Sequence, residues 1–399
     1  MTRAPHSDPT QGPPIIADLF AGPGGLDIAA EVLGVPSIGV EWERSTRATR
    51  KAAGLRTTGI GDVAKLNPLD PEVRSARVLA GGPPCQTYSV AGNREGHDHL
   101  EDVKLLAHRV GRSRTVAELK KAWAVVEKTA VELEWADERT GLVLQPLRWI
   151  VEKKIKSEPY DAVVLEQVPT VLPVWKEYRD ILRALGYDAG CHILYTEEYG
   201  VPQTRRRAVL IARYRGDGSS GNDLDFPEKT HQRYEARNPA PSQNRLFEAS
   251  PKKKENEREP WVSMGTALGS SRSTKFVVRS NYGSGGKPEN RGLRTSDMPA
   301  ATVTGKVRRN RVFDLKGTDA QGKPELGPEQ DRFTFTEAGL LQTFPAAYPW
   351  QGTDVAQQIG NAIPPLLAVH VLCAALGLDD TAKRKAITAL KSWRPPLSR

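Results

Sequence analysis

Through about its first two hundred residues, the sequence alternates short apolar runs with segments of helical periodicity. Each apolar run ends in a polar or glycine-rich turn, and this alternation is typical of an α/β domain built on a mainly parallel sheet. Two later runs, at 192–200 and 206–214, predict an antiparallel pair at the edge of that sheet. The runs that we expect to form the other strands lie at 13–20, 37–42, 77–82 and 161–168.

The rest of the chain differs in composition. Between about 215 and 330, Gly, Ser, Pro and basic residues dominate and long apolar runs disappear, whereas 364–377 returns to a helical pattern. We therefore predict an α/β domain at 1–214, a small loop-rich domain at 215–350, and a C-terminal segment at 351–399 that returns to the first domain. A disordered linker is the alternative for the basic segment, and its interleaved aromatic residues favour a folded domain.

The charge balance favours a polyanionic partner. The chain has 57 Lys and Arg against 48 Asp and Glu, a formal net charge of +9, and such a balance attracts phosphate backbones. No segment approaches the ~18 consecutive apolar residues of a membrane span, and the N-terminal residues include no apolar stretch that could act as a signal peptide. We accordingly expect a cytoplasmic protein with no membrane partner.

Only three cysteines occur, too few and too scattered for a disulfide framework or a four-thiolate zinc site. Cys191 and Cys373 lie inside apolar periodic runs and are expected to be inert. Cys85 instead follows two glycines and two prolines in a turn after a strand, where a thiol can be exposed and its thiolate favoured. We therefore expect Cys85 to be the reactive one. The histidines at 97–108 lack metal-ligand spacing, so we predict no metal site.

Polar residues also follow the predicted strands. The turn AGPGG follows the first strand, but Asp27 stands where the dinucleotide-binding pattern needs its third glycine, and Asp18 and Asp27 would repel a pyrophosphate. Glu41 and Trp42 end the second strand, where a carboxylate can bond ribose hydroxyls and an indole can stack on adenine, and Asp62 can accept from an exocyclic amine. Together these residues predict a site for an adenosine that carries no phosphate.

Glu166 ends the fourth predicted strand, where a buried carboxyl can serve as the proton donor or electrostatic partner that thiolate attack requires. The later cluster QTRRR places Arg205 and Arg207 on one face of a strand, opposite Arg206, so that one face can contact a substrate carbonyl or phosphate. A solvated strand edge is the alternative for this cluster.

Eight ordered blocks resemble the cytosine-5 DNA methyltransferase family. They are DLFAGPGGLD, VEW, GDV, GGPPCQTYS, LEQV, QTRRR, TEAGLLQTFPAAYPW and QQIGNAIPPLLA. The resemblance implies a Rossmann-like S-adenosylmethionine-dependent methyltransferase fold, with a target-recognition domain at 215–350. It also implies a monomeric DNA (cytosine-5-)-methyltransferase that acts on double-stranded DNA, uses S-adenosylmethionine, and belongs to a restriction-modification system with a separately encoded endonuclease.

The resemblance further implies roles for particular residues. Cys85 would attack C6 of a flipped-out cytosine, Glu166 would engage N3 and the exocyclic amine, and Arg205 would steady the base. The residues implied in S-adenosylmethionine binding are Phe20, Gly22, Gly24, Glu41, Trp42, Asp62, Pro83, Asn361, Ala362 and Ile363.

Two features depart from the family pattern. Gln167 stands where the family usually has Asn, and an insert at about 95–136 separates the cysteine loop from DERTGL. The insert carries an amphipathic helix at 115–135, which we expect to pack on the domain because it holds fewer than three heptads. We hypothesise that the insert extends the catalytic loop and contacts DNA through Arg112, Arg114, Lys120 and Lys121.

Two alternative functions remain beside this interpretation, and a third class of enzyme is less favoured still. One is methylation of cytosine in transfer RNA, which the long basic recognition segment disfavours. The other is a DNA-binding regulator that keeps the fold without the activity, which the presence of both Cys85 and Glu166 disfavours. A nicotinamide-dependent dehydrogenase is disfavoured by Asp27 in the glycine pattern.

Overall fold

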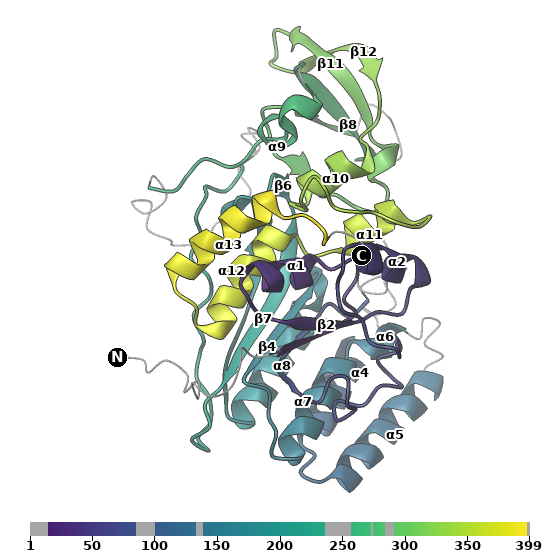
Figure 1. Ribbon diagram of the computed structural model, residues 1–399, viewed down its shortest axis with the longest axis vertical. Coiled ribbons are helices and arrows are strands. Elements are labelled where there is room, and N and C mark those ends of the chain that lie inside the picture. Colours follow the sequence, from purple (N-terminus) through teal and green to yellow (C-terminus); the bar gives the residue numbers. More distant parts are fainter. Residues whose placement is uncertain are drawn as a thin grey trace.

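The computed structural model describes residues 15–84, 100–132, 139–235, 257–272, 274–283 and 291–396. The strands of its main sheet are β1 Ile15–Leu19, β2 Ser37–Val40, β3 Ala76–Gly81, β4 Ala162–Gln167, β5 Tyr187–Tyr195 and β7 Arg206–Tyr214. They form a six-stranded sheet in the order β2-β1-β3-β4-β7-β5 (Figure 1). The first four strands run parallel, and β7 is antiparallel to both β4 and β5. The predicted mainly parallel sheet with an antiparallel edge pair is therefore confirmed.

Helices cover both faces of this sheet (Figure 1). Side chains of β1 alternate between the two layers: Ile16 packs with α1 and α12, whereas Ala17 and Leu19 pack in the cluster that holds α7 and α8. Both faces are buried, which explains why the strands are continuous apolar runs in the sequence. The helices of this part are α1 Gly25–Val32, α2 Arg44–Ala52, α4 Leu100–Gly111, α5 Val116–Glu132, α6 Arg139–Leu142, α7 Gln145–Ile155, α8 Leu172–Ala184, α12 Pro365–Leu376 and α13 Asp380–Ser392.

A second sheet lies at one end of the molecule, above the main sheet in Figure 1. Its strands are β8 Phe276–Gly283, β9 Arg291–Thr295, β11 Arg311–Thr318 and β12 Pro324–Gln330, antiparallel in the order β12-β11-β8-β9. Phe276, Val278 and Val312 pack one face against α9 (Met264–Leu268) and α10 (Phe335–Leu341). The composition predicted a loop-rich region, and the sheet was not foreseen because β12 is largely polar and exposed or half-exposed along its length.

Two connections join the sheets. The short strand β6 (Gln203–Thr204) pairs in parallel with β10 (Ala300–Ala301). The other is the segment after α10, where Phe344 and Tyr348 pack against Ile28 of α1 in a small apolar cluster. The chain thus returns to the first domain before its last helices.

One apolar stretch, Val355–Leu376, is long and apolar enough to cross a membrane. It contains α11 (Val355–Asn361) and α12, and 67% of its most apolar window is buried inside the protein. α12 packs on α1, α13, β4 and β7. Its apolar character is therefore that of a core helix.

The insert forms the helical hairpin α4–α5. Leu119, Ala122 and Val126 of α5 are buried in the main core, which confirms that the amphipathic helix packs on the domain. Arg114 donates to the carbonyl oxygens of Gly111, at 3.1 Å, and Ser113, at 3.3 Å. That side chain therefore closes the end of α4.

The lysines proposed to contact DNA lie early in α5. Only four residues join α4 to α5, so the two packed helices run in opposite directions. Lys120 and Lys121 consequently lie at the end of the hairpin remote from Leu100, where the chain comes from the cysteine loop. The proposed DNA contact of these lysines stays a prediction.

Candidate active site

The carboxyl ends of four parallel strands meet at one edge of the main sheet, where α/β proteins bind their ligands. Phe20 follows β1, Glu41 follows β2, Gly82 follows β3, and Glu166 lies at the end of β4. Residues predicted for cofactor binding and for catalysis thus gather along this edge.

The glycine turn after β1 has one open side and one packed side. Phe20 and Gly22 have positive φ angles of 59° and 56°. A Cβ on Gly22 would meet only the carbonyl oxygen of Phe20, at 4.0 Å, whereas a Cβ on Gly24 would lie 2.1 Å from Leu55 Cδ1. Gly22 therefore leaves room for a ligand, and Gly24 is required by packing at the start of α1.

Glu41 is held by the backbone of this turn. Its carboxylate accepts the N–H of Gly22 at 2.8 Å and that of Glu43 at 2.7 Å. Burial raises the pKa of Glu41, and these two amide donors oppose the rise. Trp42, directly beside it, is 64% exposed, so a buried acceptor and an uncovered indole lie side by side.

Asp62 has local partners. Its carboxylate accepts the N–H of Ala64 at 3.0 Å and lies 3.6 Å from Nζ of Lys65. The side chain is partly exposed, so its remaining lone pairs can accept further donors. The edge therefore offers a buried carboxylate (Glu41), an exposed indole (Trp42), an open glycine (Gly22) and a second acidic acceptor (Asp62). These groups fit an adenosine with an aliphatic cationic tail, such as S-adenosylmethionine.

Asp27 does not belong to this ligand surface. The sequence suggested that Asp18 and Asp27 would repel a pyrophosphate in this site, but Asp27 is fully buried and pairs with Arg50 of α2 at 2.6 Å. Burial raises the pKa of Asp18 well above its usual value, and Asp27 adds to the rise. Asp27 therefore has a structural partner that sequence spacing did not reveal.

The residues that follow α11 close this region. A Cβ on Gly25 would lie 2.2 Å from the carbonyl oxygen of Ile363, so the residues after α11 lie against the start of α1. Ala362 is buried, whereas Asn361 is exposed and accepts from the side chain of Gln357 at 2.7 Å. The structure thus brings the predicted C-terminal cofactor residues next to the glycine turn.

Cys85 lies outside the described residues, but the start of its loop is defined. The side-chain amide of Gln167 donates to the carbonyl oxygen of Pro83, and its own oxygen accepts the N–H of Val168. A Cβ on Gly82 would lie 3.7 Å from Oε2 of Glu166. The longer amide at position 167 therefore reaches the loop, and the chain enters that loop beside the Glu166 carboxylate.

Glu166 has a cationic partner that the sequence did not single out. Nε of Arg207 lies 2.6 Å from Oε1 of Glu166, and both side chains are almost buried. Arg205, for which the resemblance implies a role in steadying the base, is buried. It donates to the carbonyl oxygens of Val303 at 3.0 Å, Gly360 at 2.9 Å and Ala362 at 3.2 Å. Arg207 rather than Arg205 is the arginine next to the carboxylate.

The remaining cysteines are placed as expected. Cys191 and Cys373 are buried, and burial raises the pKa of both thiols, that of Cys373 to about 11. Within the described part of the chain, no group of His, Cys, Asp and Glu is arranged to hold a metal ion. His108 pairs with Glu177 at 2.6 Å, and the predicted loop residues 97–99 lie outside the described ranges.

The C-5 cytosine-specific DNA methylase family matches residues 15–119 and 132–375. The chain belongs to this family. It is a DNA (cytosine-5-)-methyltransferase with the α/β architecture described above. The matched ranges include the glycine turn, Glu41, Glu166 and Arg207. The stretch between the two ranges, 120–131, falls within α5.

Relatives match along most of the chain. The type II methyltransferase M1.HphI of Haemophilus parahaemolyticus is 25% identical over 391 residues, which are 91% of this chain and 86% of that protein. M.NgoFVII of Neisseria gonorrhoeae is 26% identical over 384 residues, or 88% and 83%. The crystal structure of the S. pombe Dnmt2 methyltransferase has the same fold, with a TM-score of 0.53 and 16% identity over 91% of this chain and 98% of that one.

Proposed function

We propose that this methyltransferase modifies C5 of a cytosine turned out of duplex DNA, at a specific sequence, through a covalent bond between Cys85 and C6 of the base. The arrangement at the ends of β3 and β4 carries the proposal. Arg207 holds Glu166 by an ion pair, and Gln167 holds Pro83, two residues before Cys85. The nucleophile's loop therefore starts next to an oriented carboxylate.

S-adenosylmethionine is the cofactor that the first part of this edge fits. Glu41 would hold the ribose hydroxyls, Trp42 would stack on the adenine, and Asp62 would accept from the adenine amine. Phe20, Gly22, Gly24 and Pro83 would line the site, and Asn361, Ala362 and Ile363 would close it. When bound, the cofactor supplies an electrophilic methyl group.

The residues of this chain would act on the base in order. The Cys85 thiolate adds to C6 while Glu166 bonds N3 and the exocyclic amine, so electron density moves to C5, which accepts the methyl group. Loss of the C5 proton then lets the C6–S bond break and returns the thiolate. Arg205, which ties Val303 to Gly360, would position this region from behind.

Access above and below the ring requires the cytosine to leave the stack. We propose that residues 215–350 recognise the DNA, because their sheet carries many arginines and joins the first domain through β6 and β10.

The relatives named above are type II methyltransferases. We therefore infer that the protein acts as a cytoplasmic monomer of a restriction-modification system with a separate endonuclease.

The test uses DNA that contains 5-fluorocytosine in place of cytosine, together with S-adenosylmethionine. Fluorine cannot leave C5 as a proton does, so a covalent protein–DNA adduct should accumulate and migrate slowly on a denaturing gel. Cys85→Ser should form none, whereas the control Cys191→Ser should form it normally. An adduct with Cys85→Ser, or methylation of transfer RNA but not of duplex DNA by the unaltered enzyme, would refute the proposal.

A further inference from the structure

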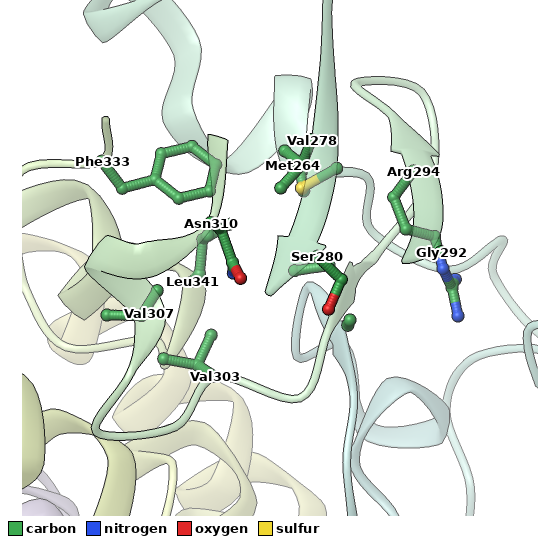
Figure 2. Close-up of a pocket in the computed structure, with 12 residues that line it drawn as sticks. Met264, Val278, Ser280, Gly292, Arg294, Val303, Val307, Asn310, Phe333 and Leu341 are labelled. Atoms are coloured by element: carbon green, nitrogen blue, oxygen red, sulfur yellow. The ribbon is translucent and has the colours of Figure 1, made fainter. Parts of the chain in front are cut away.

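A cavity of about 190 Å³ opens between β8, β9 and the segment 300–310 (Figure 2). Its floor is apolar and is made by Met264, Val278, Val303 and Phe333, all of them nearly fully buried. Pockets for drug-sized ligands measure ~300–1,000 Å³. This smaller cavity therefore suits a single flat ring. None of the residues placed in the candidate active site lines this cavity.

The rim of the cavity is rich in hydrogen-bond donors. The backbone N–H of Asn281 donates to Oδ1 of Asn310 at 2.8 Å, which leaves the Nδ2 group of that amide to donate elsewhere. Figure 2 shows the polar ends of Asn310 and Ser280 directed toward the space between them. Arg294 adds a guanidinium, and none of the twelve residues that line the cavity is acidic.

Arg294 is held in place before any ligand arrives. Its guanidinium lies 4.5 Å from the centre of the Tyr234 ring and donates to Thr204 Oγ1 and to the carbonyl oxygen of Pro299, each at 3.4 Å. A guanidinium has five N–H donors, so donors remain after these two bonds. A fixed planar fork of this kind matches a ligand with two neighbouring acceptors.

The cavity also borders the β6–β10 pair that joins the two sheets. Its wall residues Ala300 and Ala301 pair with Gln203 and Thr204 of β6, directly before Arg205. The next wall residue, Val303, receives a hydrogen bond from Arg205 itself. A group bound in the cavity would therefore lie beside the connection between the two sheets.

We propose that this cavity receives one base of the recognition sequence and selects guanine through Arg294 and Asn310. Of the four bases, only guanine presents two acceptors, O6 and N7, on its major-groove edge; adenine and cytosine present an amine donor there, and thymine presents a methyl group beside one acceptor. A donor-rich rim without a carboxylate therefore favours guanine over the other three. This inference rests on the proposed function, because it requires the substrate to be duplex DNA.

The test is methylation of a pool of duplexes with random bases on both sides of a cytosine, followed by bisulfite sequencing of the products. With the unaltered enzyme, we expect at least one position to require guanine. Arg294→Lys keeps the charge but loses the fork, and we expect it to reduce the guanine preference at one such position by about tenfold. The other positions should keep their preferences.

Asn310→Asp gives an independent test. Aspartate can still accept the N–H of Asn281, but it replaces the donor facing the cavity with an acceptor, so it should weaken the guanine preference at the same position. The matched control is Arg311→Lys, since Arg311 lies on the same sheet but pairs with Glu329 and does not line the cavity. That variant should keep the full pattern, and thermal unfolding would check that all three variants fold.

The outcomes separate this inference from the proposed function. If the unaltered enzyme methylates no duplex DNA, the proposed function is wrong and the cavity has no such base to receive. If it methylates DNA, yet Arg294→Lys and Asn310→Asp leave every positional preference intact, the inference alone is overturned. A uniform loss of methylation at all sequences would also overturn it, because that pattern signifies a phosphate contact.

Discussion

Arg50 and Asp27 form a fully buried ion pair beneath the glycine turn, with Nη1 of Arg50 2.6 Å from Oδ2 of Asp27. The same guanidinium donates to the carbonyl oxygens of Gly22 at 3.3 Å and Arg56 at 2.8 Å. The pair therefore connects α2 to the turn whose open side faces the candidate cofactor site.

Arg50→Met should lower the free energy of unfolding by about 3–5 kcal/mol, because it leaves the Asp27 carboxylate buried without its partner. Urea denaturation would measure this. Asp27→Leu combined with Arg50→Met should recover much of the loss, since neither charge then remains buried. A double variant no more stable than the single one would contradict the explanation. Calorimetric titration should also show weaker S-adenosylmethionine binding by Arg50→Met.

Arg207→Met should reduce kcat by roughly 10- to 100-fold, at or below the lower end of the ~10²- to 10⁴-fold that a positioned acid or base contributes, because Glu166 keeps its carboxyl group but loses the cation that orients it. The dissociation constant for S-adenosylmethionine should stay the same, since the Glu41 side of the site is unaltered. Arg206→Met is the matched control, because Arg206 is the exposed neighbour. Equal losses in the two variants would mean that the cluster acts only through its charge.

Gln167→Leu should slow methyl transfer about 3- to 10-fold, the effect of losing one hydrogen bond of 0.5–1.5 kcal/mol, because leucine cannot donate to the Pro83 carbonyl. Gln167→Asn has the same amide on a side chain one methylene shorter, so its rate should lie between those of leucine and glutamine. Single-turnover kinetics with excess enzyme would measure the step. Identical rates for all three side chains would show that the Pro83 contact has no role in catalysis.

Glu197→Gln should make stability less dependent on pH. Burial raises the pKa of Glu197 to about 7, from the usual value of 4.5 for a glutamate side chain. Between these values the folded state holds a proton that the unfolded state has lost, so stability falls as pH rises from about 4.5 to about 7. Above that window, the glutamine variant should be more stable than the unaltered protein by about 3 kcal/mol.

Urea denaturation at pH 5 and pH 8 would measure this dependence. The difference in unfolding free energy between the variant and the unaltered protein should be larger at pH 8. A difference of the same size at both pH values would contradict the assignment.

The sequence was sufficient to predict the main sheet because β1 to β4 are buried on both faces and therefore appear as apolar runs. It also placed Glu41 and Glu166 correctly at strand ends, because the ends of those runs are visible in the sequence. The second sheet, β12-β11-β8-β9, was not predictable in the same way. Strands such as β12 have little buried apolar surface, so their pairing depends on neighbours distant in sequence.

Side-chain partners across elements were the main omission. Alternation along a strand put Arg205 and Arg207 on one face, but the chain leaves β6 after Thr204 and starts β7 at Arg206, so the alternation is broken at Arg205. Arg205 turns inward to three carbonyl groups, and Arg207 meets Glu166 across the β4–β7 pair. Likewise, the ion-pair partner of Asp27 is Arg50 of α2, and the two meet only through tertiary packing.

The candidate cofactor edge combines the first strand of the described chain with residues near its C-terminal end. Ile363 lies on the start of α1, and Trp393 packs with Tyr348 and Ile28 in the same small cluster. During translation, this edge therefore cannot assemble until the chain has been synthesised at least as far as Ile363. A nascent chain that stops before this segment would lack one wall of the candidate cofactor site, so methylation should begin only after the segment has been made.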